Sequence, residues 1–203
     1  MATNEKLLIF DFDGVLLEDT GGLSHKIFAE QVPDLALDEY LSWFDGNVHA
    51  TLEENRVRVD LQRFFADYAR AIADIRVRPE MRAALGMLVG SYTLAVISSN
   101  VGDTIRGYLS RSRVLAGFAH VWGHEMAGNK VEKIQRLLQT YDIPADACWF
   151  VTDTLGDLLE GRAVGVSCIG VTWGFHPRER LALGTPVAIV DTLQELCEFL
   201  LLR

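Results

Sequence analysis

The chain has 203 residues, and 28 acidic against 19 basic side chains give it a formal net charge of −9 at pH 7. Hydrophobic residues make up 49% of the sequence and charged ones 23%, an ordinary globular mixture that excludes a disordered or collagen-like chain and a small disulfide-stapled scaffold. The acidic balance also argues against a nucleic-acid partner, which needs concentrated Lys and Arg, and against binding to an anionic membrane. The length accommodates one large domain, or a core domain with an insertion.

Three cysteines lie in apolar runs, at Cys148, Cys168 and Cys197, and their odd number favours buried free thiols in a reducing compartment. The first ten residues, MATNEKLLIF, contain too short an apolar run for a signal peptide. No segment approaches the ~18 consecutive apolar residues that a membrane-spanning helix needs. We therefore expect a soluble, cytoplasmic protein.

Short apolar runs of the kind found in buried strands recur along the chain. In chain order they are residues 7–10, 94–97, 121–122, 149–151, 168–171 and 187–190, and most of them end abruptly at a polar residue. Such runs are typical of parallel sheets that are covered on both faces. Helical patterns lie between them, so the alternation predicts an α/β protein with a doubly wound, open parallel sheet.

Two helical patterns near the end of the chain have recognisable starts. Apolar residues at three- and four-residue spacing run from Val131 to Tyr141, and Asn129 is a suitable cap for this helix. A second pattern covers residues 193–201, and we expect Asp191 to cap it.

Residues 16–79 contain no strand-like run and are far too numerous for a loop. Their clearest helical face is formed by Val57, Leu61, Phe64, Phe65, Tyr68, Ile72 and Ile75. We therefore expect a small helical cap domain, inserted after the first strand and lying over the carboxyl ends of the strands, where open α/β sheets bind their ligands. Residues 1–15 and 80–203 form the predicted core domain.

Two carboxylates follow the first predicted strand, in the run Asp11-Phe12-Asp13-Gly14. Residues two apart on a strand point the same way, so both carboxylates can face one pocket, and Gly14 allows a sharp turn. Because two adjacent carboxylates repel, the arrangement calls for a cation or for a shared proton. One carboxylate can attack phosphorus while the other transfers protons.

Three further polar groups fall at the same edge of the predicted sheet. They are the run Ser98-Ser99-Asn100, whose N–H, hydroxyl and amide groups suit phosphoryl oxygens; Lys130, which can neutralise a phosphate; and the pair Asp153 and Asp157. Together with Asp11, the two later aspartates form an oxygen-rich site suited to Mg²⁺ rather than to zinc. Each group alone has a structural explanation as a cap or a solvated side chain, and Lys133 is an alternative to Lys130.

In sequence order, DFDGVL, VISSN, Lys130 and TDTLGD resemble the four motifs of the haloacid dehalogenase-like hydrolase superfamily, over essentially the whole chain. The resemblance implies a Rossmann-like core with a cap in the position of that family's C1 cap, and an enzyme of the phosphatase type. It also implies that Asp11 forms an aspartyl-phosphate and that Asp13 is the general acid and base. The dehalogenase branch of the family lacks an aspartate at the position of Asp13.

The same resemblance implies the remaining site residues. Phosphate would be bound by Ser98, Ser99, Asn100 and Lys130, and Mg²⁺ by Asp11, the backbone carbonyl of Asp13, Asp153 and, more weakly, Asp157. The chain departs from the family pattern at Thr152, where a glycine is usual and where the larger side chain could narrow the pocket. Residues 172–180 resemble a loop of the phosphoglycolate phosphatase-like branch, and Glu18 and His176 are further candidates for contact with the substrate.

One group of residues in the predicted cap is a candidate for a functional role. Trp43, Phe44 and His49 could line a substrate pocket, but aromatic residues at helical spacing are more often core, and we interpret them as core.

The sequence thus predicts a Mg²⁺-dependent phosphomonoester hydrolase that acts on a small phosphorylated metabolite. A sugar-phosphate mutase of the β-phosphoglucomutase kind would share the same site, with a substrate hydroxyl in place of water. A non-catalytic, phosphate-responsive regulatory module is a third interpretation, because phosphorylatable receiver domains also carry aspartates and a lysine on a parallel sheet. The physiological substrate and the oligomeric state do not follow from the sequence.

Overall fold

The computed structural model describes residues 5–203. Its centre is a six-stranded sheet in the order β3-β2-β1-β4-β5-β6, in which every neighbouring pair is parallel. The strands are β1 (Leu7–Phe10), β2 (Thr93–Ile97), β3 (Phe118–Trp122), β4 (Cys148–Thr152), β5 (Ser167–Val171) and β6 (Ala188–Val190). The predicted doubly wound α/β fold is confirmed.

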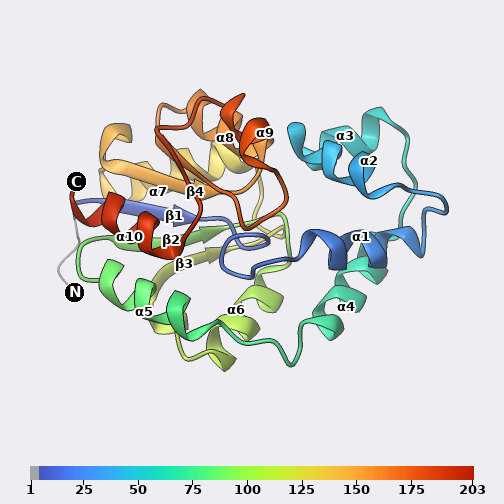
Figure 1. The fold of residues 1–203 in the computed structure, drawn as a ribbon, viewed down its shortest axis with the longest axis horizontal. Coiled ribbons are helices and arrows are strands. Elements are labelled where there is room, and N and C mark those ends of the chain that lie inside the picture. Colours follow the sequence, from blue (N-terminus) through green and yellow to red (C-terminus); the bar gives the residue numbers. More distant parts are fainter. Residues whose placement is uncertain (1–4) are drawn as a thin grey trace.

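Helices cover both faces of this sheet (Figure 1). They are α5 (Pro79–Leu88), α6 (Gly102–Arg111), α7 (Lys130–Tyr141), α8 (Leu155–Ala163), α9 (Arg178–Ala182) and α10 (Leu193–Leu201), with short 3₁₀ turns at η2 (Leu115–Gly117) and η3 (Ala145–Ala147).

Successive side chains of each strand enter different cores, as the period of two requires. Leu8 and Phe10 of β1 pack on the face covered by α5, α6 and α10. Leu7 and Ile9 pack on the opposite face, with α7, α8 and α9. All four side chains are 0% exposed, which is why this strand reads as an unbroken apolar run in the sequence.

A second group of helices separates β1 from α5 in the chain. They are α1 (Gly21–Ala29), α2 (Leu37–Ser42), the 3₁₀ turn η1 (Trp43–Asp45), α3 (Val48–Glu54) and α4 (Leu61–Ala71). Figure 1 shows these inserted helices beyond the carboxyl ends of the strands, with α2 and α3 on the side of α8 and α9. Asp45 of η1 forms an ion pair with Arg180 of α9, and this pair ties the inserted helices to the sheet layer.

Of the two predicted helix starts, one differs from the structure. The last helix is capped by Thr192, whose side chain accepts a hydrogen bond from the Glu195 N–H, and not by Asp191. Asp191 instead forms an ion pair with Arg178 at 2.7 Å. Asn129 does cap α7, and with Glu132 it forms a reciprocal capping box. Within residues 5–203, no helix combines the length and the apolar character needed to cross a bilayer.

Candidate active site

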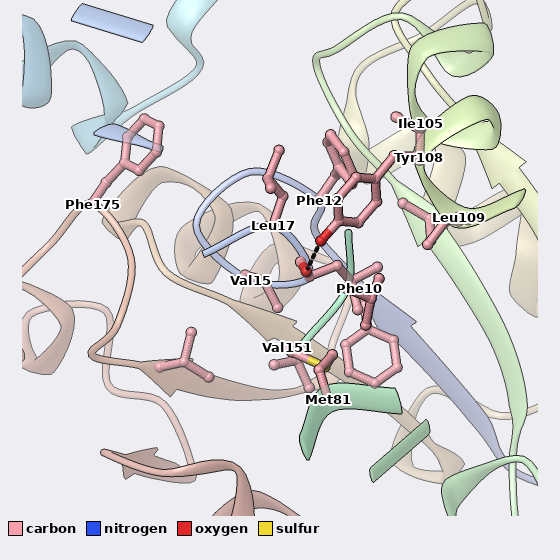
Figure 2. Packing of buried hydrophobic residues seen from close by; sticks show 14 of the residues in the cluster. Phe10, Phe12, Val15, Leu17, Met81, Ile105, Tyr108, Leu109, Val151 and Phe175 are labelled. Atoms are coloured by element: carbon pink, nitrogen blue, oxygen red, sulfur yellow. Dashed lines mark hydrogen bonds between the residues drawn. The ribbon is translucent and has the colours of Figure 1, made fainter. Parts of the chain in front are cut away.

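The turn after β1 is anchored by the side chain between its two carboxylates. Phe12 is 0% exposed, and its ring lies edge-on against that of Tyr108, with the ring centroids 5.3 Å apart. The Tyr108 hydroxyl donates a hydrogen bond to the Leu16 carbonyl at 3.1 Å, which fixes the far side of the turn (Figure 2). With Phe12 held in the core, both Asp11 and Asp13 line a single pocket.

Asp11 is held by one backbone and one side-chain donor. The Phe12 N–H donates to its Oδ1 at 2.7 Å, and the Lys130 ammonium donates to its Oδ2 at 2.9 Å. The same ammonium lies 2.5 Å from Oδ2 of Asp157. Lys130 is the first residue of α7, so the capping box places its side chain between two aspartates that follow β1 and β4.

Burial governs the protonation of this cluster. It raises the pKa of Asp11 well above its ordinary value; the Lys130 ammonium lowers that pKa, whereas the carboxylates of Asp157 and Asp153 raise it further. Burial opposes the charge of Lys130 as well, but the carboxylates of Asp11 and Asp157 outweigh it and raise the lysine pKa. Lys130 therefore stays cationic, and a bound cation or phosphate would redistribute charge among these groups.

Asp13 is bound by two neutral donors that lie far apart in the sequence. The Tyr68 hydroxyl of α4 donates a short hydrogen bond to Oδ1, and the Asn100 amide donates to Oδ2 at 3.0 Å. Burial raises the pKa of Asp13, while the two hydrogen bonds and Lys130 lower it. The sequence assigned Tyr68 only to an apolar helix face; nothing in the sequence placed its hydroxyl beside Asp13.

The loop after β2 carries the predicted phosphate-binding residues. The Ser98 hydroxyl accepts a hydrogen bond from the Asn100 N–H at 3.0 Å, and the Asn100 side-chain oxygen accepts one from the Val101 N–H at 2.7 Å. Ser98 and Ser99 line the pocket with the aspartates. This loop precedes α6, so polar side chains and N–H groups gather beside Asp13.

Asp153 lies deeper than the other aspartates. It is 0% exposed, its Oδ2 accepts a hydrogen bond from the Phe175 N–H at 2.7 Å, and its buried Oδ1 has no hydrogen-bond partner in the described part of the protein. Burial raises the pKa of this carboxyl to about 8. A Cβ at Gly14, whose φ is +73°, would lie 1.9 Å from Asp153 Oδ2, so a glycine is required there.

Thr152, which stands where the family usually has glycine, contacts Asp157 directly. It is fully buried, and its hydroxyl donates a hydrogen bond to Asp157 Oδ2 at 2.8 Å. The hydroxyl therefore shares that oxygen with Lys130 and fixes the carboxylate at the start of α8.

The pocket between these groups has a volume of about 50 Å³. Of the predicted site residues, those that line it are Asp11, Asp13, Ser98, Ser99, Lys130 and Asp157; the inserted helices contribute Phe44, Gly46, Asn47 and Val48. Asn100 lines the adjoining cavity, and Asp153 lies behind the pocket wall. Most of the predicted site residues thus meet at one edge of the sheet.

Two residues that the sequence suggested as substrate contacts lie outside the pocket. Glu18 forms an ion pair with Arg78 at 3.1 Å and lines a separate groove of about 910 Å³ between α5 and α10. His176 is 1% exposed, and both of its ring nitrogens are used: Nδ1 accepts from the Leu155 N–H and Nε2 bonds to the Leu41 carbonyl. His176 therefore has no ring nitrogen free for a substrate.

The alternative lysine is engaged outside the pocket. The Lys133 ammonium donates to the Gly123 carbonyl at 2.8 Å, and so it supports the loop after β3.

The interpretation of the aromatic residues in the inserted helices as core is only partly correct. Trp43 is buried at 4% exposure, against Phe28 and Tyr40. Phe44 and His49, in contrast, line a cavity that opens beside Asp13. Helical spacing could not separate these cases, because the cavity wall and the core lie on neighbouring faces of the same short helices.

Comparison with known proteins agrees with this geometry. Residues 8–171 match the family model described as haloacid dehalogenase-like hydrolase. The probable phosphatase IndB of Dickeya dadantii is 30% identical over 93% of this chain and 90% of its own length. The phosphoglycolate phosphatase of Synechococcus elongatus is 24% identical over 94% of this chain and 95% of its own length.

Solved structures of the family have the same fold. A haloacid dehalogenase-like family hydrolase from Streptococcus pneumoniae superposes with a TM-score of 0.78 at 20% identity, over 96% of this chain and 98% of its own. The chain therefore belongs to the haloacid dehalogenase-like hydrolases, as a phosphatase-type enzyme of the phosphoglycolate phosphatase-like branch.

Proposed function

We propose that this enzyme is a Mg²⁺-dependent phosphomonoester hydrolase that acts on a small phosphorylated metabolite through an aspartyl-phosphate. The observation that carries the proposal is the convergence of Asp11 and Asp13 on one small pocket, with the Lys130 ammonium 2.9 Å from Asp11. A pocket of about 50 Å³ suits a phosphoryl group rather than a polymer.

In the proposed reaction, a carboxylate oxygen of Asp11 attacks phosphorus in line while the P–O bond to the leaving group breaks. Asp13 donates its proton to the leaving oxygen, which departs as an alcohol. Asp13 then takes a proton from water as the water oxygen attacks the phosphoryl group, releasing phosphate and restoring Asp11. Lys130, Ser98 and the neighbouring N–H groups stabilise the charge on the phosphoryl oxygens.

The donor set fits Mg²⁺. Among the described residues, no three acidic, histidine or cysteine side chains are already grouped as a metal cage. Mg²⁺ does not need one, because it usually binds one or two carboxylates and completes its shell with phosphate oxygens and waters. The unpartnered, buried Asp153 Oδ1 is the strongest support for a cation. Asp11, the Asp13 carbonyl, Asp153 and Asp157 would hold the ion, which supplies positive charge to the phosphoryl group when bound.

We also propose that residues 16–79 form a cap domain over a core made of residues 1–15 and 80–203. Helices α1–α4 lie within the proposed cap, and every strand lies within the proposed core. Residues 1–4 of that core lie outside the described residues.

The nucleophile is tested with Asp11→Asn, assayed for hydrolysis of p-nitrophenyl phosphate in Mg²⁺ buffer. We expect a loss of more than about 10³-fold in kcat, because an amide oxygen is a poor nucleophile. Asp146→Asn is the matched control, because Asp146 is exposed in η3 and the substitution removes the same charge at a position away from the pocket. Turnover near wild type in a folded Asp11→Asn protein would overturn the assignment.

A further inference from the structure

A second cavity, of about 80 Å³, lies under the cap beside the phosphate pocket. Its walls are mostly apolar side chains of α1, η1, α3 and α4, among them Phe28, Phe44, Val48, Leu52, Phe64 and Phe65. We refer to it as the cap cavity.

The cap cavity and the phosphate pocket adjoin each other. Asp13, Phe44, Val48, Ser99 and Phe175 line both of them. Asp13 is the proposed proton donor to the leaving oxygen, and it stands at the junction. A phosphomonoester with phosphorus beside Asp11 would therefore extend its leaving group past Asp13 into the cap cavity.

The cap cavity offers no positive charge to a leaving group. Within the described residues, neither Lys nor Arg lines it, and its ionisable members are Asp13, Tyr40, His49 and Tyr68. Burial lowers the pKa of His49, and the nearby His124 and Lys133 lower it further, so its imidazole is neutral near pH 7. Burial raises the pKa of Tyr40 and of Tyr68, which keeps both hydroxyls protonated.

These walls offer no cationic side chain to stabilise an anionic leaving group. A carboxylate that enters an apolar cavity loses its hydration and finds no cation in return, whereas an alkyl group gains from leaving water. The negative charge of Asp13 adds to the penalty whenever that carboxyl is ionised.

We propose that this phosphatase takes phosphomonoesters whose leaving group is a compact, uncharged, apolar alcohol, and that it discriminates against phosphates that also carry a carboxylate, such as phosphoglycolate. This inference rests on the proposed hydrolase function and adds the class of substrate. It separates this chain from the phosphoglycolate phosphatases that it resembles, because the cap cavity has no cationic side chain to bind the second anionic group.

The test compares two substrates of nearly equal shape in Mg²⁺ buffer, by phosphate release from the full chain. Phosphoglycolate carries a carboxylate, and 2-methylallyl phosphate replaces the two carboxylate oxygens by a methyl and a methylene group. We expect kcat/KM for 2-methylallyl phosphate to be higher by about 100-fold, within the range over which apolar pockets discriminate. A value for phosphoglycolate that equals or exceeds it overturns the inference.

Hydrolysis of p-nitrophenyl phosphate serves as the reference. If neither the reference ester nor either test substrate is hydrolysed, the proposed hydrolase function is wrong. If the reference is hydrolysed and phosphoglycolate is preferred, the function stands and only the substrate class is wrong.

A cation placed at the cap cavity should shift the preference. His49→Lys adds a charge at the wall, and we expect the ratio of kcat/KM for phosphoglycolate to that for 2-methylallyl phosphate to rise at least about tenfold. Ala50→Lys adds the same charge on the exposed side of α3, outside the cap cavity, and should leave the ratio unchanged. An equal shift in both variants contradicts the role of the cavity wall, and the wild-type substrate pair remains decisive should His49→Lys fail to fold.

Discussion

The contact between Tyr68 and Asp13 joins a helix of the proposed cap, called the cap below, to the proposed acid and base. Tyr68 is 1% exposed, and its hydroxyl donates to one oxygen of the Asp13 carboxylate while Asn100 donates to the other. Both donors are neutral, so they orient the carboxylate without adding a charge beside the leaving group. Proton transfer depends on such orientation, because the carboxyl must reach the leaving oxygen within hydrogen-bond distance.

Tyr68→Phe should therefore slow substrates that need protonation more than those that do not. We expect kcat/KM to fall by about 10- to 100-fold for an alkyl phosphate and by much less for p-nitrophenyl phosphate, whose leaving group departs without a proton. The control is Tyr92→Phe, which removes a buried hydroxyl bonded to the Leu200 carbonyl at 2.6 Å, away from the site. Equal losses on both substrates would show that Tyr68 acts only through packing.

The cap meets the core where the first turn of α8 packs against the backbone that follows η1. A Cβ at Gly156, in the first turn of α8, would lie 2.3 Å from the Gly46 carbonyl oxygen and 2.7 Å from its carbon. Such an approach is possible only for glycine, because backbone atoms cannot yield as the end of a flexible side chain can. The Asn47 amide, which donates to Glu160 Oε1 at 3.0 Å, reinforces this junction.

Gly156→Ala should displace the cap and reduce activity without unfolding the core. We expect kcat/KM to fall by about 10- to 100-fold, since displacements near 1 Å in an active site have effects of that size. Gly86→Ala is the matched control: position 86 is exposed on α5 and a Cβ there meets nothing within 4 Å, so the free energy of unfolding should rise by about 0.5–1 kcal/mol. Full activity in a folded Gly156→Ala enzyme would contradict a closed junction.

The elements themselves followed from the sequence to different degrees. The four inner strands were predictable because each is a largely buried apolar run, as β1 shows with four side chains at 0% exposure. The edge strands β3 and β6 are partly exposed, and the sequence indicated only residues 121–122 of β3. The cap of α10 was misassigned because Asp191 and Thr192 are both good capping residues, and the Asp191 carboxylate bonds Arg178 and Thr172 instead. Such tertiary competition leaves no trace in a local pattern.

The site was predictable where its residues follow strands and unpredictable where they come from the cap. Asp11 and Lys130 meet because the end of β1 and the start of α7 lie at the same edge of the sheet. Tyr68 reaches Asp13 across 55 positions, through the packing of α4, and no spacing rule encodes that distance. His176 was a candidate for substrate contact because it is titratable and lies in a loop. Its ring nitrogens instead bond backbone groups of two different segments.

For the whole molecule, His176 makes the closed arrangement of cap and core sensitive to acid. Its ring bridges the Leu155 N–H of the core and the Leu41 carbonyl of the cap, and burial lowers its pKa below the ordinary value of 6.5. Protonation would place a hydrogen on Nδ1, facing the Leu155 N–H. The hydrogen bond between these two groups would then be lost, because both would be donors. The unfolded chain therefore binds this proton more readily than the folded one, so the contribution of His176 to the free energy of unfolding rises with pH.

We accordingly expect the contribution of His176 to the free energy of unfolding, taken as the difference between wild type and His176→Asn in urea denaturation, to decrease as the pH falls below about 6.5. The contribution of this one proton is at most about 1.4 kcal/mol per pH unit. His176→Asn keeps an acceptor for Leu155 but does not titrate, so its free energy of unfolding should lack this contribution between pH 5 and 7. An unchanged slope in that variant would assign the acid sensitivity to other groups.

The apolar wall of the cap cavity comes almost entirely from one unbroken stretch, Ser24 to Tyr68, whereas the proposed catalytic side chains come from widely separated points in the chain. A single exchange of a gene segment could therefore replace the pocket while leaving the phosphoryl-transfer groups in place. Phe175, whose N–H binds Asp153 and whose ring packs on Phe44, is the one apolar side chain of this wall, among the described residues, that lies outside that stretch. Modular inheritance of this kind lets substrate preference diverge faster than the chemistry.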